Sequence, residues 1–422
     1  MISDDQGVAV KHQLIGNGFN GYWGHHYARL FVMVKVPAFG YSTYILSEAK
    51  MGIDLYRQKD QRVDKETRDQ FRLENEKLKV VFHPVNGSIL SLVDKASGEE
   101  LVDTKQATGI FRLIHEDTNK WMTAWWVGRY MRVENIHEKN VVIKKVYDES
   151  SPLRQAISYE MSFERSKLKV TVSLDHNSSA LDFNVECDWH ELGKQGDQLP
   201  QLNFFMPVGY TCETYKYDVA FGTIDRAPLM MDVPANSWGL AMRKNPKKKS
   251  IKITTRTKYG FRGIDNSIAL TLLRSSCDPD PYPEIGLHKF QFAVSVVGPT
   301  DNKTHIEDAY QYCHPMQVIS SAPQKGNLPT DHSFAKIIEG HVAISAIKAP
   351  ETSSNHQWVI RLYETEGKAT KATLQFAKAP IKAHWADLHE TPIQGHDKIT
   401  IKGHNLTFSV EPNKIASLWV EF

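Results

Sequence analysis

The sequence predicts an all-β protein made of several antiparallel β-sandwiches. Apolar and polar residues alternate with a period of two along most of the chain, which is typical of half-buried strands. Clusters of Gly, Pro, Asn and Asp separate these runs and indicate turns. One window, residues 300–313, has the pattern of a short helix with Thr300 or Asp301 as its N-cap. Many short strands without intervening helices indicate sandwiches.

Two polar segments divide the chain into three expected domains. Residues 57–70 are almost wholly polar, and residues 321–333 are rich in Pro, Gly and Ser. A chain of 422 residues is too long for a single sandwich. We therefore expect a partial sandwich or hairpin with a linker over 1–70, a large sandwich over 71–320 and a C-terminal sandwich over 321–422.

The first strand pairs have recognisable turns. Residues 27–46 have the pattern of strand, turn and strand, with the bend at Pro37 to Gly40. Two strands are marginally stable alone, so this pair must lean on the larger domain or on polypeptide upstream. In residues 78–101 the Asn86-Gly87 pair accepts positive φ at both turn positions, which favours a two-residue hairpin.

Later segments repeat the pattern. Residues 167–189 place a polar Asp-His-Asn-Ser-Ser turn between two strands, residues 250–275 predict two more, and residues 404–422 end the chain in the same way. The basic run 243–253 contains the turn residues Asn-Pro before alternating Ile residues. A solvated hairpin explains it better than a polyanion-binding patch.

Composition indicates an ordinary globular protein. The chain is 41% hydrophobic and 24% charged, and its net charge of +2 creates no field toward nucleic acid or membrane. No run approaches 18 apolar residues, and residues 1–14 contain no signal-peptide core. The four cysteines share no metal-binding spacing and suggest a reducing compartment; they are Cys187, Cys212, Cys277 and Cys313. We therefore expect a cytoplasmic protein, with a homo-oligomer left open.

Two motifs have simple structural explanations beside functional ones. His25 and His26 are adjacent, so on a strand they point to opposite faces, which does not suit metal ligation. Trp121, Trp125 and Trp126 fit a core strand, an aromatic platform for sugar rings or a contact with another domain.

The strand expected over residues 181–192 has one polar face. Alternation places on that face Asp182, Asn184, Glu186, Asp188 and His190. Two such carboxylates could serve a glycosidase as nucleophile and acid. Polar strand faces are also common where no chemistry occurs.

Residues 270–290 hold the densest group of charged residues. A buried strand ends at Arg274, and a loop stiffened by three prolines carries Asp278, Asp280 and Glu284 before a strand that contains His288. A stiff loop positions such groups at low entropic cost. Contact with a sugar hydroxyl or a neighbouring domain explains this stretch better than a complete acid–base pair. No nucleotide-binding, serine-hydrolase or zinc-protease motif occurs.

Several stretches resemble, in order, the region that follows the catalytic domain of family 38 glycoside hydrolases, the α-mannosidases. "VKVPAFGYSTYIL" resembles the family's Pro-x-x-Gly-Tyr hairpin, and "LENEKLKVVFHPVNGSILSLVDKASGEEL" resembles the opening of its large β-domain. "LDFNVECDWHE", "APLMMDVPANSWGLAM" and "KYGFRGIDNSIALTLLRSSCDPDPYPEIGLHKFQFAV" resemble the middle of that domain. "WVIRLYETEGKATKATLQF" and "WADLHETP" resemble the terminal sandwich. The resemblance spans about residues 27–422.

The resemblance implies β-sandwich domains, the largest a supersandwich similar to galactose mutarotase. It also implies hydrolysis of terminal α-mannosides with retention, through an aspartate nucleophile and a bound zinc. In the family those groups belong to an N-terminal α/β barrel, which is followed by a three-helix bundle, and neither region is recognisable here. No residue of this chain therefore inherits a catalytic or zinc-binding role, and we expect the chain alone to be inactive. The zinc and the α-mannoside substrates would bind the missing catalytic domain.

The resemblance further implies that loops of the large β-domain reach the substrate cleft. We expect Tyr259, Arg274, Asp280 and His288 at the cleft rim. Trp121, Trp125 and Trp126 would contact sugar or a neighbouring domain.

Two other functions compete with this one. The chain could be a stand-alone carbohydrate-binding module that uses its Trp-rich segment. It could also be a mutarotase-like epimerase that uses His288 with Glu186 or Glu284, which only fold analogy supports.

Overall fold

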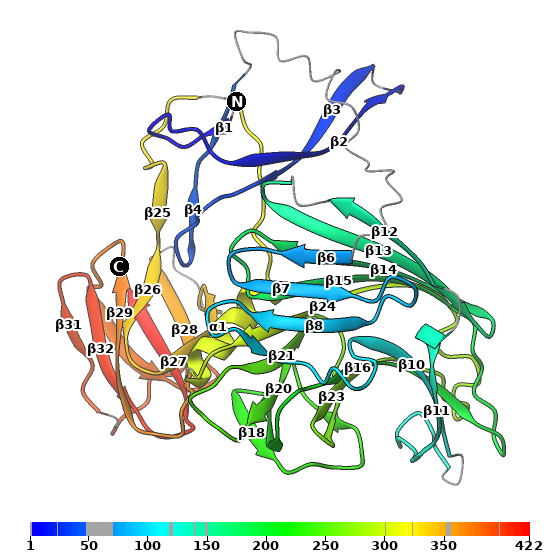
Figure 1. The fold of residues 1–422 in the computed structure, drawn as a ribbon. Helices are drawn as coiled ribbons and strands as arrows, with labels where there is room; N and C mark the ends of the chain where they lie inside the picture. The colour runs from blue at the N-terminus through cyan, green and yellow to red at the C-terminus, as the bar shows by residue number, and fades with distance from the viewer. Residues whose placement is uncertain are drawn as a thin grey trace.

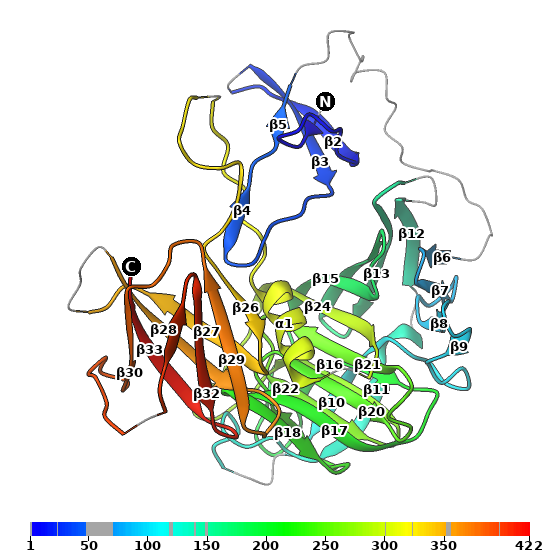
Figure 2. The same ribbon diagram turned by 90° about the vertical axis from the view of Figure 1, so that its left-hand side faces the viewer.

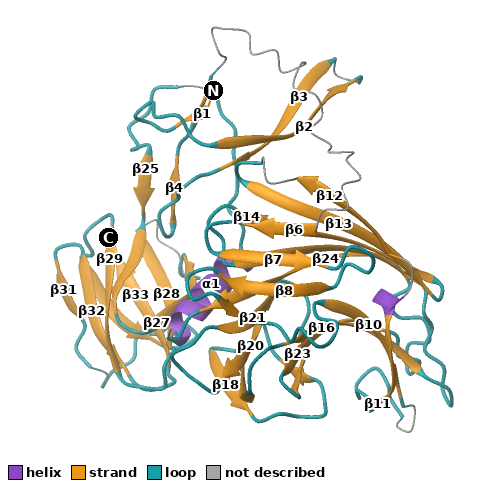
Figure 3. Cartoon of the chain, in the orientation of Figure 1, coloured by secondary structure: helices purple, strands orange, loops and turns teal. Residues whose placement is uncertain are grey.

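The computed structural model describes residues 2–22, 24–47, 71–117, 121–138, 141–147, 151–299, 301–322, 324–351, 356–395 and 397–422. In these residues strands dominate and one α-helix occurs, so the expected all-β class is confirmed (Figure 3). Figure 1 shows a large central sandwich, a smaller C-terminal sandwich beside it and an N-terminal segment that lies above both. The linker expected at 57–70 lies outside the described residues.

The large sandwich consists of two antiparallel sheets around one core. The nine-stranded sheet contains, in spatial order, β12 (Val141–Tyr147), β13 (Arg154–Phe163), β14 (Ser166–Asp175), β15 (Ala180–Trp189), β24 (Gly286–Val297), β21 (Ser250–Thr255), β20 (Trp238–Arg243), β17 (Cys212–Val219) and β18 (Gly222–Arg226). The six-stranded sheet contains β11 (Tyr130–Asn135), β10 (Ile110–Glu116), β16 (Leu199–Pro207), β23 (Ser267–Arg274), β22 (Gly260–Ile264) and β19 (Val233–Pro234). A four-stranded sheet precedes them and contains β6 (Phe71–Glu74), β7 (Leu78–Phe82), β8 (Ile89–Asp94) and β9 (Glu99–Glu100). The 3₁₀ turn η1 (Ile136–Glu138) follows β11.

Aromatic side chains from both sheets meet at the centre of this sandwich. The rings of Phe183 and Phe292 stack with centroids 4.8 Å apart, and the centroid of Phe204 lies 4.7 Å from that of Phe292. Phe183 alternates with polar residues along β15, as the period-two pattern predicts, whereas β16 is buried along almost its whole length. Each fully buried phenylalanine contributes about 1.5–3 kcal/mol to folding.

The C-terminal sandwich has its own core. One sheet contains β26 (Ala335–Glu339), β29 (Thr370–Phe376), β32 (Asn405–Val410) and β31 (Thr400–Lys402), and the other contains β27 (Val342–Lys348), β28 (Gln357–Glu364), β33 (Ile415–Glu421) and β30 (Lys382–Ala386). Leu374, Leu406 and Leu418 are fully buried between them. The domain boundaries expected from the sequence stay a prediction.

Helix α1 (Asn302–Cys313) lies between the two sandwiches (Figure 2). Its N-cap is Asp301, whose carboxylate accepts a hydrogen bond from the backbone N–H of Thr304 at 2.9 Å. Ile306 packs with Trp238 of the large sandwich and with Tyr363 of the C-terminal sandwich. The helix expected near residue 300 is therefore confirmed, and it joins two hydrophobic cores.

The pairing expected within residues 27–46 is wrong. β2 (His12–Asn20) pairs with β3 (His25–Val32), β1 (Ile2–Ser3) pairs with β5 (Ile45–Leu46), and β4 (Gly40–Ser42) pairs with β25 (Asp331–Ser333). The alternation in this segment was interpreted correctly as strands. Their partners are other strands, and each pairing is still a two-stranded sheet, so these strands depend on contacts with the rest of the molecule.

The N-terminal segment leans on the large sandwich. The side-chain oxygen of Gln13 accepts hydrogen bonds from the backbone N–H groups of Leu153 and Arg154, both at 3.0 Å. The guanidinium carbon of Arg154 lies 4.1 Å from the ring centroid of Phe31.

A two-residue turn with positive φ at both positions lies at Asp265-Asn266 and not at Asn86-Gly87. Asp265 and Asn266 have φ of 51° and 52°, which the turn between β22 and β23 requires. In the turn between β7 and β8, Gly87 has positive φ and Asn86 does not. The pairing of these strands shifts register at Phe82, and the turn is longer than two residues. Residues 250–275 consequently form three strands in two sheets, where the sequence predicted two strands.

Other local expectations are confirmed. β14 and β15 form the expected hairpin, as do β20 and β21 around the basic run. Lys249 of that run pairs with Asp94 at 2.7 Å, which supports a structural use of these charges. All four cysteines are free thiols. Within the described ranges, no helix has the length and apolar character needed to cross a bilayer.

Candidate functional site

Residues 121–129 form a loop that exposes three tryptophans. Trp121 is 78% exposed, Trp125 68% and Trp126 57%. The interpretation of this segment as a core strand is therefore wrong. The backbone N–H groups of Met122 and Ala124 bond Asp278 at 2.8 and 2.9 Å, so this segment runs along the loop after β23 instead of joining a sheet.

Arg274, at the end of β23, holds this loop from inside. Its guanidinium donates to both carboxylate oxygens of Glu116 at 2.8 Å, to the carbonyl of Trp126 at 2.7 Å and to the carbonyl of Thr123. Glu116 also accepts from the backbone N–H of Gly128 at 2.7 Å. Because these donors are used by groups of the protein, Arg274 positions the tryptophan loop.

Glu116 is fully buried and continues into a polar network over the six-stranded sheet. Burial raises the pKa of Glu116, and the Arg274 contact acts in the opposite direction. The amide of Gln201 donates to Glu116 at 3.2 Å and to Asp232 at 2.9 Å, and the hydroxyl of Tyr130 donates to Asp232 at 2.9 Å. The sequence analysis missed this network. Its signal was polar residues at alternate positions of otherwise apolar strands.

Exposed methionines are next to members of this network in the sequence: Met131 follows Tyr130, and Met230 and Met231 precede Asp232. Met131 is 61% exposed, Met230 79% and Met231 59%. Arg262 joins their loops, because it donates to the carbonyl of Met230 and its guanidinium carbon lies 3.6 Å from the ring centroid of Tyr130. We call these three methionines and the three tryptophans the aromatic face.

The other expected rim residues lie at the end of the large sandwich where β23 ends and β24 begins. Tyr259 is 60% exposed, and Asp280 lies in the exposed loop, where it accepts from the backbone N–H of Tyr282 at 3.0 Å. The Nε2 atom of His288 lies 2.6 Å from the carbonyl oxygen of Glu284. Their role at a cleft rim stays a prediction.

The epimerase pair of His288 and Glu186 is excluded by strand register. In the pairing of β15 with β24, Cys187 is opposite His288, so Glu186 points to the other face, where it approaches Lys289 at 3.6 Å. Glu284 remains near His288, with 3.7 Å between its carboxylate and Nδ1.

One group in the described part of the chain has metal-ligand spacing. Ligand atoms of Asp301, His341 and Glu366 all lie within 4.8 Å of one another. Asp301 already caps α1, and Glu366 accepts from the backbone N–H of Lys303 at 3.0 Å. Through these contacts the three residues connect the start of α1 to the C-terminal sandwich, which explains why they lie close together. His25 and His26 lie on β3, where the ring of His26 packs 4.9 Å from that of Phe19.

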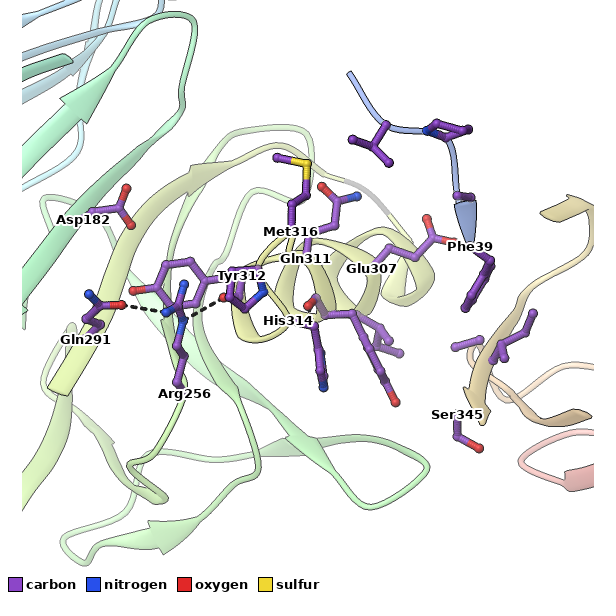
Figure 4. Close-up of a pocket in the computed structure, with 18 of the residues that line it drawn as sticks. Phe39, Asp182, Arg256, Gln291, Glu307, Gln311, Tyr312, His314, Met316 and Ser345 are labelled. Atoms are coloured by element: carbon purple, nitrogen blue, oxygen red, sulfur yellow. Dashed lines mark hydrogen bonds between the residues drawn. The ribbon is translucent and has the colours of Figure 1, made fainter. Parts of the chain in front are cut away.

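A large cavity lies away from the aromatic face. It has a volume of about 1280 Å³ and is enclosed by the nine-stranded sheet, α1, β27 and residues 36–39 (Figure 4). The polar face expected on residues 181–192 is confirmed, and Asp182 and Asn184 line this cavity. Burial, together with the nearby Asp175, raises the pKa of Asp182 to about 6. Glu186 and Asp188 face a separate hollow, so the strand does not bring two carboxylates together here.

Two family models match the chain. The model described as "Glycosyl hydrolases family 38 C-terminal domain" matches residues 73–282, and the model described as "Glycosyl hydrolases family 38 C-terminal beta sandwich domain" matches residues 341–418. Together they cover about two thirds of the chain.

Similar proteins support the same assignment. "Alpha-mannosidase 2C1" of Mus musculus is 24% identical over 416 residues, which cover 93% of this chain and 37% of that protein. "Alpha-mannosidase G" of Dictyostelium discoideum is 23% identical over 313 residues, which cover 70% of this chain and 27% of that protein. A solved family 38 protein from Enterococcus faecalis has a TM-score of 0.73 at 17% identity, and the match covers all of this chain and 52% of that one. The chain thus spans about a third of the length of its curated relatives.

Proposed function

Because this chain belongs to glycosyl hydrolase family 38 through the C-terminal domains of that family, we propose that it is the non-catalytic C-terminal portion of an α-mannosidase. In this role it supports a catalytic domain and forms one wall of the cleft for terminal α-mannosides. The aromatic face is the observation that carries the proposal.

The aromatic face suits contact with a domain or substrate. Contiguous exposed apolar patches on soluble proteins usually mark interaction sites. The tryptophan loop is ordered by its contacts with Arg274, Glu116 and Asp278, so its side chains are presented in a fixed direction. Tryptophan rings bind the apolar C–H faces of sugars by stacking.

The carboxylates beneath this face are suited to structure and not to glycoside cleavage. Retaining hydrolysis needs two carboxyl groups about 5–5.5 Å apart that reach the substrate. Glu116 is bound by Arg274, and Asp232 accepts from Tyr130, Gln201 and Thr271. We therefore place nucleophile and acid in a catalytic domain outside this chain.

The same proposal places the zinc of the family in the catalytic domain. Asp301, His341 and Glu366 fit a catalytic zinc poorly, because two of these side chains already accept backbone hydrogen bonds at a junction of domains. We also propose a cytoplasmic location, since the four cysteines are unpaired.

The test is an activity assay of the purified chain with an aryl α-mannoside, with and without added zinc. We expect no hydrolysis above the blank. Zinc-dependent turnover by this chain would overturn the proposal.

A stand-alone carbohydrate-binding module is the second candidate, favoured by the exposure of Trp121, Trp125 and Trp126. It requires mannose oligosaccharides to bind the chain alone, with affinity that the triple alanine variant of these tryptophans loses. Calorimetry of both proteins with mannotriose decides between the two functions.

A further inference from the structure

The large cavity between the nine-stranded sheet, α1 and β27 has a polar corner at the outer face of that sheet. Asp182 and Asn184 come from β15, Gln291 comes from β24, and Arg256 follows β21. Asp182 and Asn184 are two residues apart on one strand, so their Cα atoms are about 7 Å apart on the same face. Tyr312 of α1 closes this corner from the opposite side (Figure 4).

The donors and acceptors of this corner are held in place before any ligand binds. Arg256 donates to the side-chain oxygen of Gln291 at 2.7 Å and to the carbonyl of Tyr312 at 2.8 Å, and its guanidinium carbon lies 4.8 Å from the Tyr312 ring centroid. The amide of Gln291 donates to Asn184 at 3.1 Å. A preorganised set of this kind binds a ligand with little loss of side-chain freedom.

Asp182 is the group of this corner whose hydrogen bonds are unfilled. Among the described residues its carboxylate has no hydrogen-bond or ion-pair partner, whereas the neighbouring Arg154 is bound to Asp175 at 2.5 and 2.7 Å. A second cavity of about 640 Å³ shares Asp182, Gln311 and Tyr312 with the first. The carboxylate therefore lies where two cavities meet. A partly buried carboxylate in such a position requires a donor from solvent or from a ligand.

We propose that this corner, which we call the Asp182 pocket, binds a neutral saccharide. Asp182 accepts hydrogen bonds from sugar hydroxyl groups, Arg256 donates to sugar oxygens, and Tyr312 packs against the ring.

The charges of the pocket favour a neutral ligand. A phosphate would face the carboxylate of Asp182, and an amine would face the guanidinium of Arg256, so each charged ligand meets a like charge. Hydroxyl groups both donate and accept, and they satisfy the two residues together. The remaining walls are mostly apolar and include Ile306, Met316 and Ile344, which suits the C–H faces of a sugar. The volume also exceeds the range of about 300–1,000 Å³ that is usual for small-ligand sites, so more than one sugar unit fits.

The site is separate from the proposed cleft wall. None of the four expected rim residues and none of the three tryptophans lines this cavity. Hydrolysis of an aryl α-mannoside by the chain would overturn the proposed function and leave this inference in place.

The experiment is isothermal titration calorimetry of the full chain with mannose, glucose, galactose and mannotriose. We expect at least one of them to bind with a dissociation constant in the millimolar range. Asp182→Ala and Arg256→Met should each weaken that binding by about tenfold or more, because each removes a hydrogen bond to a charged group. Asp182→Asn should weaken it less, because it retains an acceptor oxygen of similar shape.

Matched controls distinguish this pocket from other sites. Glu186→Gln changes a carboxylate on the same strand and the same face outside the cavity, and it should leave the affinity unchanged. The triple alanine variant of Trp121, Trp125 and Trp126 should also bind normally. Thermal unfolding followed by circular dichroism checks that each variant is folded.

Three results would overturn the inference. The first is the absence of binding heat for all four sugars at about 10 mM ligand. The second is sugar binding that the tryptophan variant loses and Asp182→Ala retains. The third is binding of inorganic phosphate or methylammonium that depends on Asp182 without any binding of sugar.

Discussion

The guanidinium of Arg274 forms a bidentate contact with the carboxylate of Glu116, and both nitrogen–oxygen distances are 2.8 Å. The two residues are 158 positions apart in the sequence. Their contact joins the end of β23 to the end of β10, and it fixes the loop that exposes three tryptophans. Arg274, which the sequence predicted at a cleft rim, thus supports the tryptophan loop from below.

Removal of Arg274 should destabilise the protein strongly. Arg274→Met leaves Glu116 buried without its counter-ion, and breaking a buried pair in this way costs about 3–5 kcal/mol. Urea unfolding measures the loss. The double variant Glu116→Leu with Arg274→Met should lose less than Arg274→Met alone, because no charge is left buried. A loss below about 1 kcal/mol in Arg274→Met would show that the pair is not a structural support.

The exposed tryptophans should matter little to stability. Replacement of Trp121, Trp125 and Trp126 by Ala should change the free energy of unfolding by about 0.5 kcal/mol or less per site, because these side chains lie mostly in solvent. Denaturant titration checks this. Trp238→Ala is the control, since that side chain is fully buried and its loss should cost about 3–5 kcal/mol. Strong destabilisation of the triple variant would mean that the loop packs more tightly than the structure shows.

The buried His137 should make the fold sensitive to acid. Burial lowers the pKa of His137 to about 4, below its usual value of 6.5, while its Nδ1 atom lies 2.6 Å from the carbonyl oxygen of Asn86. Between these two pH values the unfolded chain binds a proton that the folded chain rejects, so stability falls as pH falls from 6.5 to 4. The expected loss is roughly 2–3 kcal/mol.

His137→Asn tests this effect, because its amide keeps a donor for the Asn86 carbonyl and does not titrate. At pH 6.5 the variant should have a lower free energy of unfolding than the unsubstituted protein. Between pH 6.5 and pH 4 that free energy should fall less in the variant. Urea midpoints at several pH values give both slopes. Equal slopes for the two proteins would refute the assignment to His137.

Asp182 should have the opposite pH dependence. Its pKa is raised to about 6 in the folded protein, mainly by burial, from an ordinary value of 3.8. The folded chain therefore binds more protons between pH 3.8 and 6, and stability falls as pH rises through this window. Asp182→Asn removes the free-energy cost of burying an ionised carboxylate, so it should stabilise the protein by about 2 kcal/mol at pH 7.5. At pH 4 the difference should nearly vanish, whereas Glu186→Gln should show no such pattern.

The buried Lys252 should be replaceable at little cost. Its side chain is 2% exposed, and its ammonium lies 3.4 Å both from the carbonyl oxygen of His305 and from the Asp308 carboxylate. Burial lowers the pKa of Lys252. Lys252→Met should be neutral or stabilising by about 1 kcal/mol, because these long contacts compensate poorly for the lost hydration. Thermal unfolding at pH 7 measures the change.

Lys249→Met is the contrasting variant for Lys252. The ammonium of Lys249 lies 2.7 Å from the carboxylate of Asp94, whose side chain is 1% exposed. Loss of Lys249 therefore leaves a buried carboxylate without this positive partner. This variant should be clearly destabilised. If Lys252→Met were the more damaging of the two, the argument from contact length would fail.

Local chemistry explains which parts of the fold were predictable. The alternation in β14 and β15, the cap at Asp301 and the basic hairpin between β20 and β21 each depend on neighbouring residues alone. The expected turn at Asn86-Gly87 does join β7 to β8, but it is longer than a two-residue hairpin, because the pairing shifts register next to it. The two-residue turn with positive φ at both positions occurs at Asp265-Asn266.

The candidate sites were less predictable for the same reason. The four expected rim residues come from one stretch and its neighbourhood; family resemblance suggested them, and their role stays a prediction. The network of Glu116, Gln201 and Asp232 comes from three distant segments, so the polar positions within each strand do not reveal that these three side chains meet. Tyr312 meets Asp182 only because α1 packs against the nine-stranded sheet.

Strand formation, the polar and apolar faces of strands such as β15, and the family resemblance could all be inferred from the amino-acid sequence. Those properties follow from the alternation of side chains along an extended backbone and from short ordered motifs. The pairing of β4 with β25, the contact of Arg274 with Glu116 and the position of Asp182 at a cavity became known from the folded molecule. Partner choice is non-local, because an unpaired strand or a buried charge is satisfied by whichever distant group the packing of the sheets brings within reach.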